Sequence, residues 1–163
     1  MIFSFINIHF QTLNTFYQLD VKFVFLHGEL NEEEYGEQPK CYELNDSPQK
    51  VYRLKKALHG LKEAPQAWFS RIEAHFMSEG FEKCYSEHTL FIKTNKGGKI
   101  LIVSLCVDDL IFTGNDKLMF AEFKNSMLRK FDMTYLGRMR FFLGIEVLQR
   151  SDGIYICQRK YAL

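Results

Sequence analysis

The chain has 163 residues, of which 47% are hydrophobic and 25% are charged, and its formal net charge is +1. This balance indicates one globular domain with a sizeable core, and a near-neutral chain binds nucleic acid poorly on average unless its charges are segregated. The four cysteines form no CxxC pair, which argues against a zinc site, and the apolar start of the chain is far shorter than the ~20 residues that span a membrane. We therefore expect a reduced, intracellular setting, in the cytoplasm or the nucleus, and no membrane partner.

The first predicted element is a strand over residues 18–27. Its β-branched and aromatic residues favour a buried strand, although apolar and polar positions alternate poorly. Asp20 lies on or beside this strand, and a buried carboxylate without a partner is costly, so Asp20 indicates a bound cation. A polar loop over residues 29–50 follows, with room for one short strand. Residues 1–17 stay unassigned.

A helix is predicted from Pro65 to about Glu79, because proline is tolerated in the first helical turn. Gly80 stands where a helix commonly ends. The helix has one apolar stripe at helical spacing, formed by Trp68, Phe69, Ile72 and Phe76. We expect this helix to pack beneath a sheet.

The second half of the chain combines predicted strands with one helix. Asn115 and Asp116 can cap that helix, which runs over about residues 117–130, and a turn is placed at Leu136 and Gly137. The Ser-Asp-Gly segment that precedes the last strand is a strong hairpin signal. The predicted strands span residues 89–93, 99–107, 110–113, 141–149 and 154–158.

Asp108 and Asp109 are the most informative pair of residues. Both carboxylates are charged at neutral pH and repel each other, and the flanking Val107 and Leu110 offer no positive partner. A cation between the two carboxylates would explain the pair. An open turn would also explain it, because aspartate is a favoured turn residue whose side chain bonds its own backbone.

Four sequence blocks follow one another along the chain: QLDVK with FLHG (18–28), LHGLKEAP (58–65), VDDLIFTG (107–114) and FLGIEV (142–147). In this order and at this spacing they resemble the blocks of copia-type retrotransposon reverse transcriptases, from about Gln18 to Leu163. The resemblance implies an α+β fold, a polymerase palm-like antiparallel sheet with two helices packed on one face. Residues 18–163 would then be a partial reverse transcriptase domain, with the fingers and thumb largely missing.

The resemblance also implies RNA-directed DNA synthesis. The 3′ hydroxyl of a primer attacks the α-phosphate of a deoxynucleotide, pyrophosphate leaves, and two Mg²⁺ or Mn²⁺ ions clamp the attacking and leaving oxygens. By position, Asp20 and Asp108 would be the bridging ligands, Asp109 the supporting third carboxylate, and the backbone carbonyl of Val21 a further ligand. The implied partners are an RNA or DNA template-primer and a deoxynucleotide.

Three further residues would line the nucleotide pocket by the same resemblance. Phe25 would pack under the incoming sugar and exclude a 2′ hydroxyl, Gly60 would let the backbone approach the ligand closely, and Lys62 would meet a phosphate. Phe25 can instead be one core aromatic among 16 phenylalanines. Lys62 can instead be a solvated lysine in a basic stretch.

Two departures from the family pattern bear on activity. Cys106 stands where a tyrosine usually precedes the paired aspartates, and Glu63 replaces a glutamine and adds a charge that repels phosphate. Together with the missing fingers and thumb, they predict a truncated copy that has no processive polymerase activity by itself, because positioning supplies much of a polymerase's rate.

Two other classes of function remain open. The chain can be a non-enzymatic retroelement remnant that only binds partners or associates with itself. It can also be a small Ca²⁺-binding or structural domain without polymerase ancestry. The distance between Asp20 and Asp108 separates the Ca²⁺-binding or structural domain from the polymerase, because carboxylates more than ~8 Å apart would not support two-metal chemistry.

Overall fold

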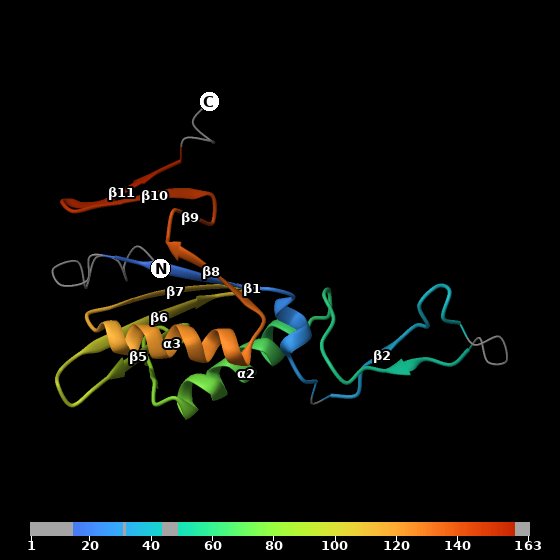
Figure 1. Ribbon diagram of the computed structural model, residues 1–163. Helices are drawn as coiled ribbons and strands as arrows, with labels where there is room; N and C mark the ends of the chain where they lie inside the picture. The colour runs from blue at the N-terminus through green and yellow to red at the C-terminus, as the bar shows by residue number, and fades with distance from the viewer. Residues whose placement is uncertain (1–14, 31, 44–48, 159–163) are drawn as a thin grey trace. The chain divides into compact units, whose positions relative to one another are not determined.

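The computed structural model describes residues 15–30, 32–43 and 49–158. The chain divides into two compact units (Figure 1): Met1–Lys22 with Glu79–Leu163, here the sheet unit, and Phe23–Ser78, here the helix unit. The described residues form two α-helices and antiparallel sheets, so the predicted α+β class is confirmed. In the described part of the chain, no helix is both long and apolar enough to cross a membrane. The unassigned segment 1–17 lies almost entirely outside the described residues.

The sheet unit contains a six-stranded antiparallel sheet in the order β4-β5-β6-β7-β1-β8. Its central strands β6 and β7 are nearly continuous apolar runs that are buried along their length, as expected of strands covered on both faces. The strand bounds are β1 Tyr17–Val21, β4 Glu82–Lys83, β5 Leu90–Thr94, β6 Ile100–Cys106, β7 Asp109–Gly114 and β8 Met133–Arg138.

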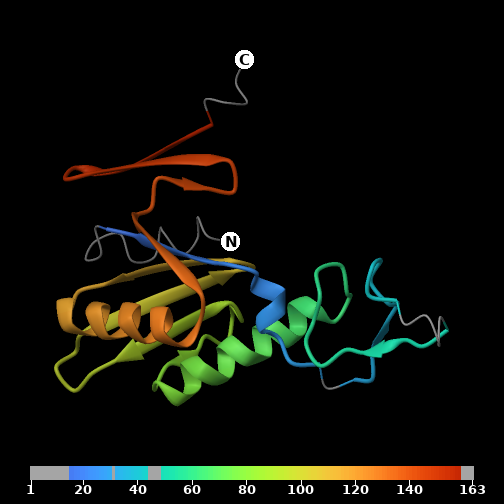
Figure 2. The same ribbon diagram turned by 45° about the vertical axis from the view of Figure 1, so that its right-hand side comes forward.

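Helix α3 (Lys117–Lys130) covers one face of this sheet, as Figures 1 and 2 show. The predicted cap is confirmed, because the Asp116 carboxylate accepts hydrogen bonds from the amides of Leu118 and Met119, each at 2.9 Å. The helix is held through its aromatic face: Phe112 of β7 lies 5.0 Å from Phe120 and 5.1 Å from Phe123 between ring centroids.

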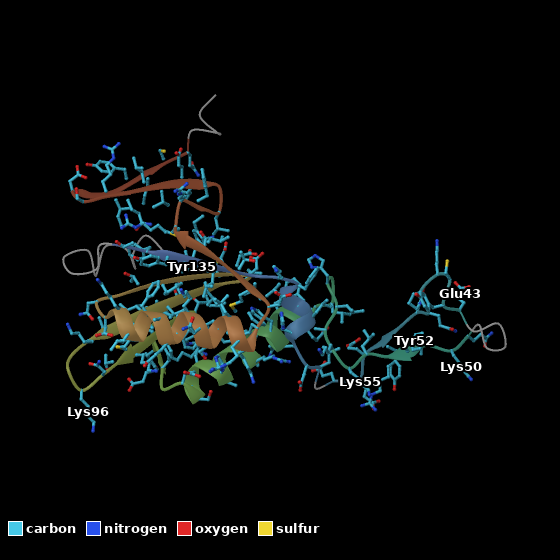
Figure 3. The ribbon with its side chains drawn as sticks, viewed as in Figure 1. Glu43, Lys50, Tyr52, Lys55, Lys96 and Tyr135 are labelled. Atoms are coloured by element: carbon cyan, nitrogen blue, oxygen red, sulfur yellow. The ribbon has the colours of Figure 1, made fainter. Side chains whose placement is uncertain are left out.

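The ring of Tyr135 on β8, labelled in Figure 3, also contacts this helix. The ammonium group of Lys124 lies 5.0 Å from the Tyr135 ring centroid, a distance at which a cation is attracted to an aromatic face. The helix is therefore fixed to the strand at one edge of the sheet as well as to the central strand β7.

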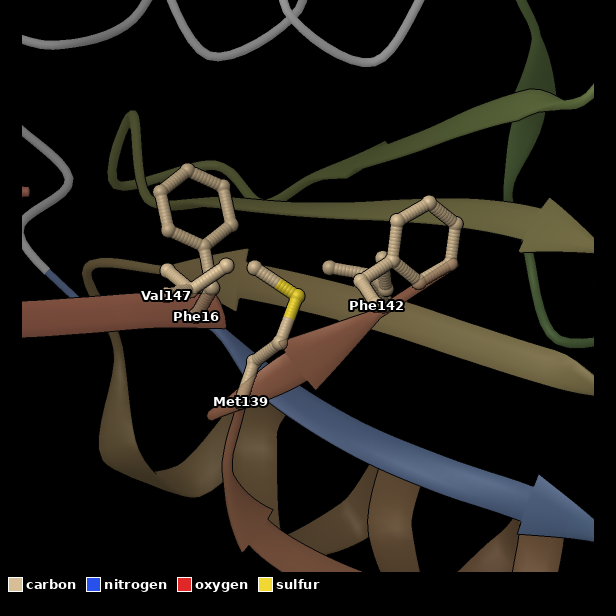
Figure 4. Close-up of a cluster of buried hydrophobic side chains, with 5 residues drawn as sticks. Phe16, Met139, Phe142 and Val147 are labelled. Atoms are coloured by element: carbon tan, nitrogen blue, oxygen red, sulfur yellow. The ribbon is translucent and has the colours of Figure 1, made fainter. Parts of the chain in front are cut away.

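A second apolar cluster lies on the opposite face of the sheet. Phe16 and Ile111 meet a small sheet of strands β9 (Phe141–Phe142), β10 (Ile145–Arg150) and β11 (Gly153–Cys157). The buried members of the cluster, drawn in Figure 4, are Phe16, Ile111, Met139, Phe142 and Val147. Because Ile111 and Phe112 are consecutive in β7, their side chains point to opposite faces, so one strand joins both cores.

Two sequence predictions in the sheet unit are wrong. The strand expected over residues 141–149 is interrupted by a turn at Leu143 and Gly144, whose φ values of 46° and 78° are those of a tight hairpin turn. The residues of the turn expected at Leu136 and Gly137 are part of β8. Gly137, with φ of 80°, lies opposite Gln18 where the register between β1 and β8 shifts. The Ser-Asp-Gly hairpin between β10 and β11 is confirmed.

The helix unit is built on α2 (Ala64–Ser78), close to the predicted helix. It buries Trp68, Ile72 and Phe76 of the predicted stripe. The 3₁₀ helix η1 (Val24–His27) packs against α2, and the short strands β2 (Tyr35–Gly36) and β3 (Tyr52–Arg53) pair with each other. Figure 3 labels exposed side chains of the polar segment around β2 and β3: Glu43, Lys50, Tyr52 and Lys55. The packing of α2 beneath the sheet stays a prediction.

The strand predicted over residues 18–27 is wrong beyond Val21. The chain turns at Lys22 and Phe23, where Phe23 has a left-handed φ of 50°, and then enters η1. Phe23 is 73% exposed and Leu26 is 42% exposed, so the apolar run does not form one buried face. The poor alternation in the sequence agrees with this result.

Candidate active site

The two distant acidic segments meet on the two neighbouring strands β1 and β7. Their antiparallel register sets Asp20 directly opposite Asp109, and residues directly opposite each other project from the same face of a sheet. The fold therefore brings these two segments, far apart in the sequence, onto neighbouring strands. The face that carries the two carboxylates is the one that carries Ile111, opposite the face covered by α3.

Asp108 lies in the turn that joins β6 and β7, while Asp109 is already the first residue of β7. The other turn residue, Val107, has a φ of 53°, a left-handed conformation that is costly for a β-branched side chain. The carbonyl oxygen of Asp108 accepts a hydrogen bond of 2.8 Å from the amide of Val21. This bond attaches the turn to the end of β1, next to Asp20.

Asp109 belongs to a row of residues in register across four strands. Cys106 on β6 is opposite Asp109, and Asp20 is opposite both Asp109 and Thr134 on β8. Burial raises the pKa of the Cys106 thiol, and the charges of Asp109 and Asp108 raise it further. Cys106 therefore keeps its proton at neutral pH and adds no charge to the site.

The carboxylate of Asp109 is partly withdrawn from water. Burial raises its pKa, a hydrogen bond from Gln18 acts in the opposite direction, and the charges of Asp108 and Asp20 raise the pKa again. The Gln18 side-chain amide donates this bond to Asp109 Oδ1 at 2.7 Å. Within residues 15–30, 32–43 and 49–158, the carboxylates of Asp20 and Asp108 have no hydrogen-bonding side chain as a partner.

These oxygens suit a hard divalent cation, because Mg²⁺ and Mn²⁺ prefer carboxylate and carbonyl ligands. The three aspartates are not packed as tightly as a closed cage for one ion. In the described part of the chain, the one group of three acidic, histidine or cysteine side chains with ligand atoms mutually within 4.8 Å is Glu32, Glu34 and Glu63 of the helix unit. Mg²⁺ does not require such a cage, because water and phosphate oxygens usually complete its coordination.

The predicted nucleotide-binding residues Phe25, Gly60 and Lys62 lie in the helix unit. The ring of Phe25 lies 5.2 Å from that of His59, so η1 meets the segment that carries Gly60. Gly60 has a φ of 96° and open space around the position of a Cβ, a conformation that glycine adopts most readily. Lys62 is exposed, and its role stays a prediction.

Gln18 was not predicted from the sequence to belong to the site. The signal was present, because residues two apart in a strand share a face and Gln18 precedes Asp20 by two positions. Glutamine is also a residue that is mostly exposed, and here it is only 7% exposed.

Replacing Asp109 with asparagine is expected to stabilise the metal-free protein at neutral pH by about 1 kcal/mol or less. The raised pKa means that the folded state penalises the ionised form. This penalty is fully present at pH values above the folded-state pKa of Asp109. It is relieved as the pH falls through that pKa towards the ordinary pKa of aspartate, about 3.9. Asparagine keeps an oxygen that can accept the Gln18 hydrogen bond and carries no charge.

Urea unfolding with a chelator present, at pH 7 and below pH 4, measures this effect. The stability difference between Asp109→Asn and the wild type should shrink as the pH falls, because the wild-type carboxylate becomes protonated. A variant that is less stable than the wild type at pH 7, or a difference that does not vary with pH, would contradict the assigned environment of Asp109.

Comparisons with known proteins add an independent result. The family model described as reverse transcriptase (RNA-dependent DNA polymerase) matches residues 5–163. The retrovirus-related Pol polyprotein from transposon TNT 1-94 of Nicotiana tabacum is 36% identical over 88% of this chain and 11% of its own length. The corresponding polyprotein from transposon RE2 of Arabidopsis thaliana is 35% identical over 90% of this chain and 10% of its own length.

A shorter relative is the putative transposon Ty5-1 protein of Saccharomyces cerevisiae, which is 30% identical over 83% of this chain and 44% of its own length. No solved structure matches the chain. The chain thus spans about a tenth of the length of the two plant polyproteins.

Proposed function

Because the chain belongs to the reverse transcriptase (RNA-dependent DNA polymerase) family of copia-type retroelements, we propose that Asp20, Asp108 and Asp109 form a two-metal centre for RNA-directed DNA synthesis. The observation that carries the proposal is the register of β1 and β7, in which Asp20 is directly opposite Asp109 and Asp108 occupies the adjoining turn. Family membership supports the proposed reaction, and the register supports these residues as the ones that would perform it.

Bound Mg²⁺ or Mn²⁺ ions would neutralise charge on the attacking 3′ oxygen of the primer and on the pyrophosphate that leaves. In this proposal Asp20 and Asp108 would hold both ions, the carbonyl of Val21 would supply one more oxygen, and Asp109 would be the third carboxylate. The hydrogen bond from the Val21 amide to the Asp108 carbonyl keeps these ligands on adjoining segments of backbone. Fixed ligands reduce the rearrangement that catalysis requires.

The nucleotide-binding roles of Phe25, Gly60 and Lys62 belong to the same proposal. Phe25 and the Gly60 segment are joined through the ring contact of Phe25 with His59, which supports one shared pocket for the incoming deoxynucleotide. An RNA or DNA template-primer is the second substrate. Residues 18–163 are accordingly proposed to be part of a reverse transcriptase domain.

The isolated chain is proposed to have no processive activity. Its net charge of +1 gives little electrostatic attraction to a polyanionic template-primer. Cys106 lies beside the aspartates, where the resemblance places a tyrosine, and a thiol does not offer the aromatic hydroxyl of that residue.

We expect the purified 163-residue chain to bind Mn²⁺ and Asp108→Asn to weaken that binding about tenfold or more, because a negatively charged hard ligand is lost. Electron paramagnetic resonance of free Mn²⁺ during a titration measures the affinity. Asp152→Asn is the matched control, because Asp152 is an exposed aspartate in the turn between β10 and β11 and should not affect binding.

Primer extension on poly(rA)/oligo(dT) with the same preparations tests the reaction. We expect no processive extension by the isolated chain. If the chain extends the primer robustly and Asp108→Asn abolishes the extension, the proposed inactivity is refuted and the two-metal centre is supported. Mn²⁺ binding that is absent, or equal in Asp108→Asn and Asp152→Asn, would refute the proposed function.

A further inference from the structure

Gln18 is a buried polar residue attached directly to the candidate active site. Its side chain is 7% exposed, and its amide nitrogen lies 2.7 Å from Asp109 Oδ1. That distance is at the short end of the range for N–H···O bonds, as expected when the acceptor is charged. Ile111 is the residue directly opposite Gln18, so the amide reaches Asp109 diagonally across the β1–β7 pair.

The hydrogen bond acts on one of the three aspartates only. In the described residues, Asp20 and Asp108 have no corresponding side-chain donor. Asp109 is half-buried, as is Asp20, while Asp108 is exposed, and the apolar cluster that contains Ile111 begins two residues beyond Asp109 along β7. The carboxylate of Asp109 can rotate about the bond that joins it to the Cβ atom, and the hydrogen bond from Gln18 holds one of its two oxygens.

We propose that Gln18 is a positioning residue, whose amide fixes the Asp109 carboxylate so that its other oxygen is presented to a divalent cation. The inference rests on the proposed function, because it requires a cation at the aspartates. Residues that orient ligands by hydrogen bonds typically affect metal affinity by about 10-fold or more when they are replaced.

A purely structural role for Gln18 leads to a different expectation. Loss of a buried hydrogen bond would then reduce stability without changing how the folded protein binds a cation. Gln18→Met removes the donor while keeping a side chain of similar length and flexibility. Thr113→Val is the matched control, because Thr113 is fully buried on the same strand as Asp109 but donates its hydroxyl to the carbonyl of Thr15, at 2.8 Å.

The decisive experiment is a double-mutant cycle on the full chain, with Mn²⁺ affinity measured by electron paramagnetic resonance for the wild type, Gln18→Met, Asp109→Asn and the double variant. We expect Gln18→Met to weaken Mn²⁺ binding about tenfold in the wild-type background and to have no further effect in the Asp109→Asn background, because Gln18 acts through Asp109. Thr113→Val should bind Mn²⁺ like the wild type.

Three results would overturn the inference: unchanged Mn²⁺ affinity in Gln18→Met, an equal loss in the Asp109→Asn background, or an equal loss in Thr113→Val. If Gln18→Met does not fold, Gln18→Asn takes its place, because the asparagine side chain is one methylene shorter than that of glutamine. Wild-type Mn²⁺ affinity in Gln18→Asn would also refute the inference. If Gln18→Met binds Mn²⁺ with wild-type affinity while wild-type binding still depends on Asp108, this inference is refuted and the proposed function is not. Wild-type protein that binds no Mn²⁺ refutes the proposed function with it.

Discussion

Replacing Phe112 with alanine is expected to lower the free energy of unfolding of the sheet unit by about 3–5 kcal/mol. Phe112 is fully buried in β7, and its ring lies 5.9 Å from Tyr17, 5.0 Å from Phe120 and 5.1 Å from Phe123. Alanine would leave a cavity at the centre of this aromatic group and remove its contacts with α3. Such a loss is a large part of the 5–15 kcal/mol that holds a typical domain together.

Urea unfolding followed by far-ultraviolet circular dichroism measures this loss. Phe141→Ala is the matched control, because the same atoms are removed from a side chain that is 57% exposed in the same unit, and we expect it to cost about 1 kcal/mol or less. Equal effects of the two substitutions would contradict the assignment of Phe112 to the core between β7 and α3.

This expectation has a consequence for the candidate active site. Phe112 and Ile111 face opposite sides of β7, and Asp109 begins the same strand. The position of the Asp109 carboxylate therefore depends on a strand that is fixed by packing on both faces. A carboxylate attached to such a strand has less freedom to move than one on an exposed loop, as a preorganised site requires.

The two α-helices could be predicted closely from the sequence because their signals are local. Helix α3 was predicted over about residues 117–130 and is found at Lys117–Lys130, since Asp116 caps the helix within its own first turn. Gly80 follows α2 with a φ of 82°, as expected of a glycine that ends a helix. Neither signal requires a partner from a distant part of the chain.

The sequence failed where bulky residues take a left-handed conformation. Phe23, Val107 and Leu143 all have positive φ values, at 50°, 53° and 46°. Such a conformation costs roughly 1–2 kcal/mol for a residue with a Cβ, so no local propensity points to it. Contacts made elsewhere in the fold must compensate for this cost, and those contacts are not visible in a window of sequence.

In the candidate site, too, the residue types follow from the sequence but their exact placement does not. Asp20, Asp108 and Asp109 are predicted from sequence blocks and their roles stay a prediction, while the pairing of their strands is seen only in the structure. The turn residues are Val107 and Asp108 rather than the two aspartates, because the register of β6 against β7 places Asp109 opposite Cys106. A register depends on pairing across the sheet, and a shift of one residue would change the face on which each carboxylate lies.

Replacing Gly28 with valine is expected to destabilise the helix unit by about 3 kcal/mol, at the upper end of the usual cost of overpacking. A Cβ at this position would lie 2.8 Å from the Cβ of Ala67 and 3.0 Å from the backbone nitrogen of Trp68. Gly28 has a φ of −74°, which any residue adopts, so lack of space is the whole reason for glycine here. Backbone atoms of a helix do not move aside as a flexible side chain does.

Gly36→Val is the matched control. The three atoms nearest to a Cβ at Gly36 all belong to the side chain of Leu54, at 3.4 Å or more, and the residue lies in the short strand β2, where valine is favoured. We expect this substitution to leave stability unchanged within about 0.5 kcal/mol.

The single tryptophan of the chain reports on this unit directly, because Trp68 is only 2% exposed and lies on α2. Urea unfolding followed by its fluorescence should move to lower urea in Gly28→Val and stay in place in Gly36→Val. A shift of the same size in both variants would mean that the close approach of Gly28 to Ala67 and Trp68 of α2 does not explain the glycine. A selective shift would show that Gly28, which follows η1, is held in contact with α2 within the helix unit.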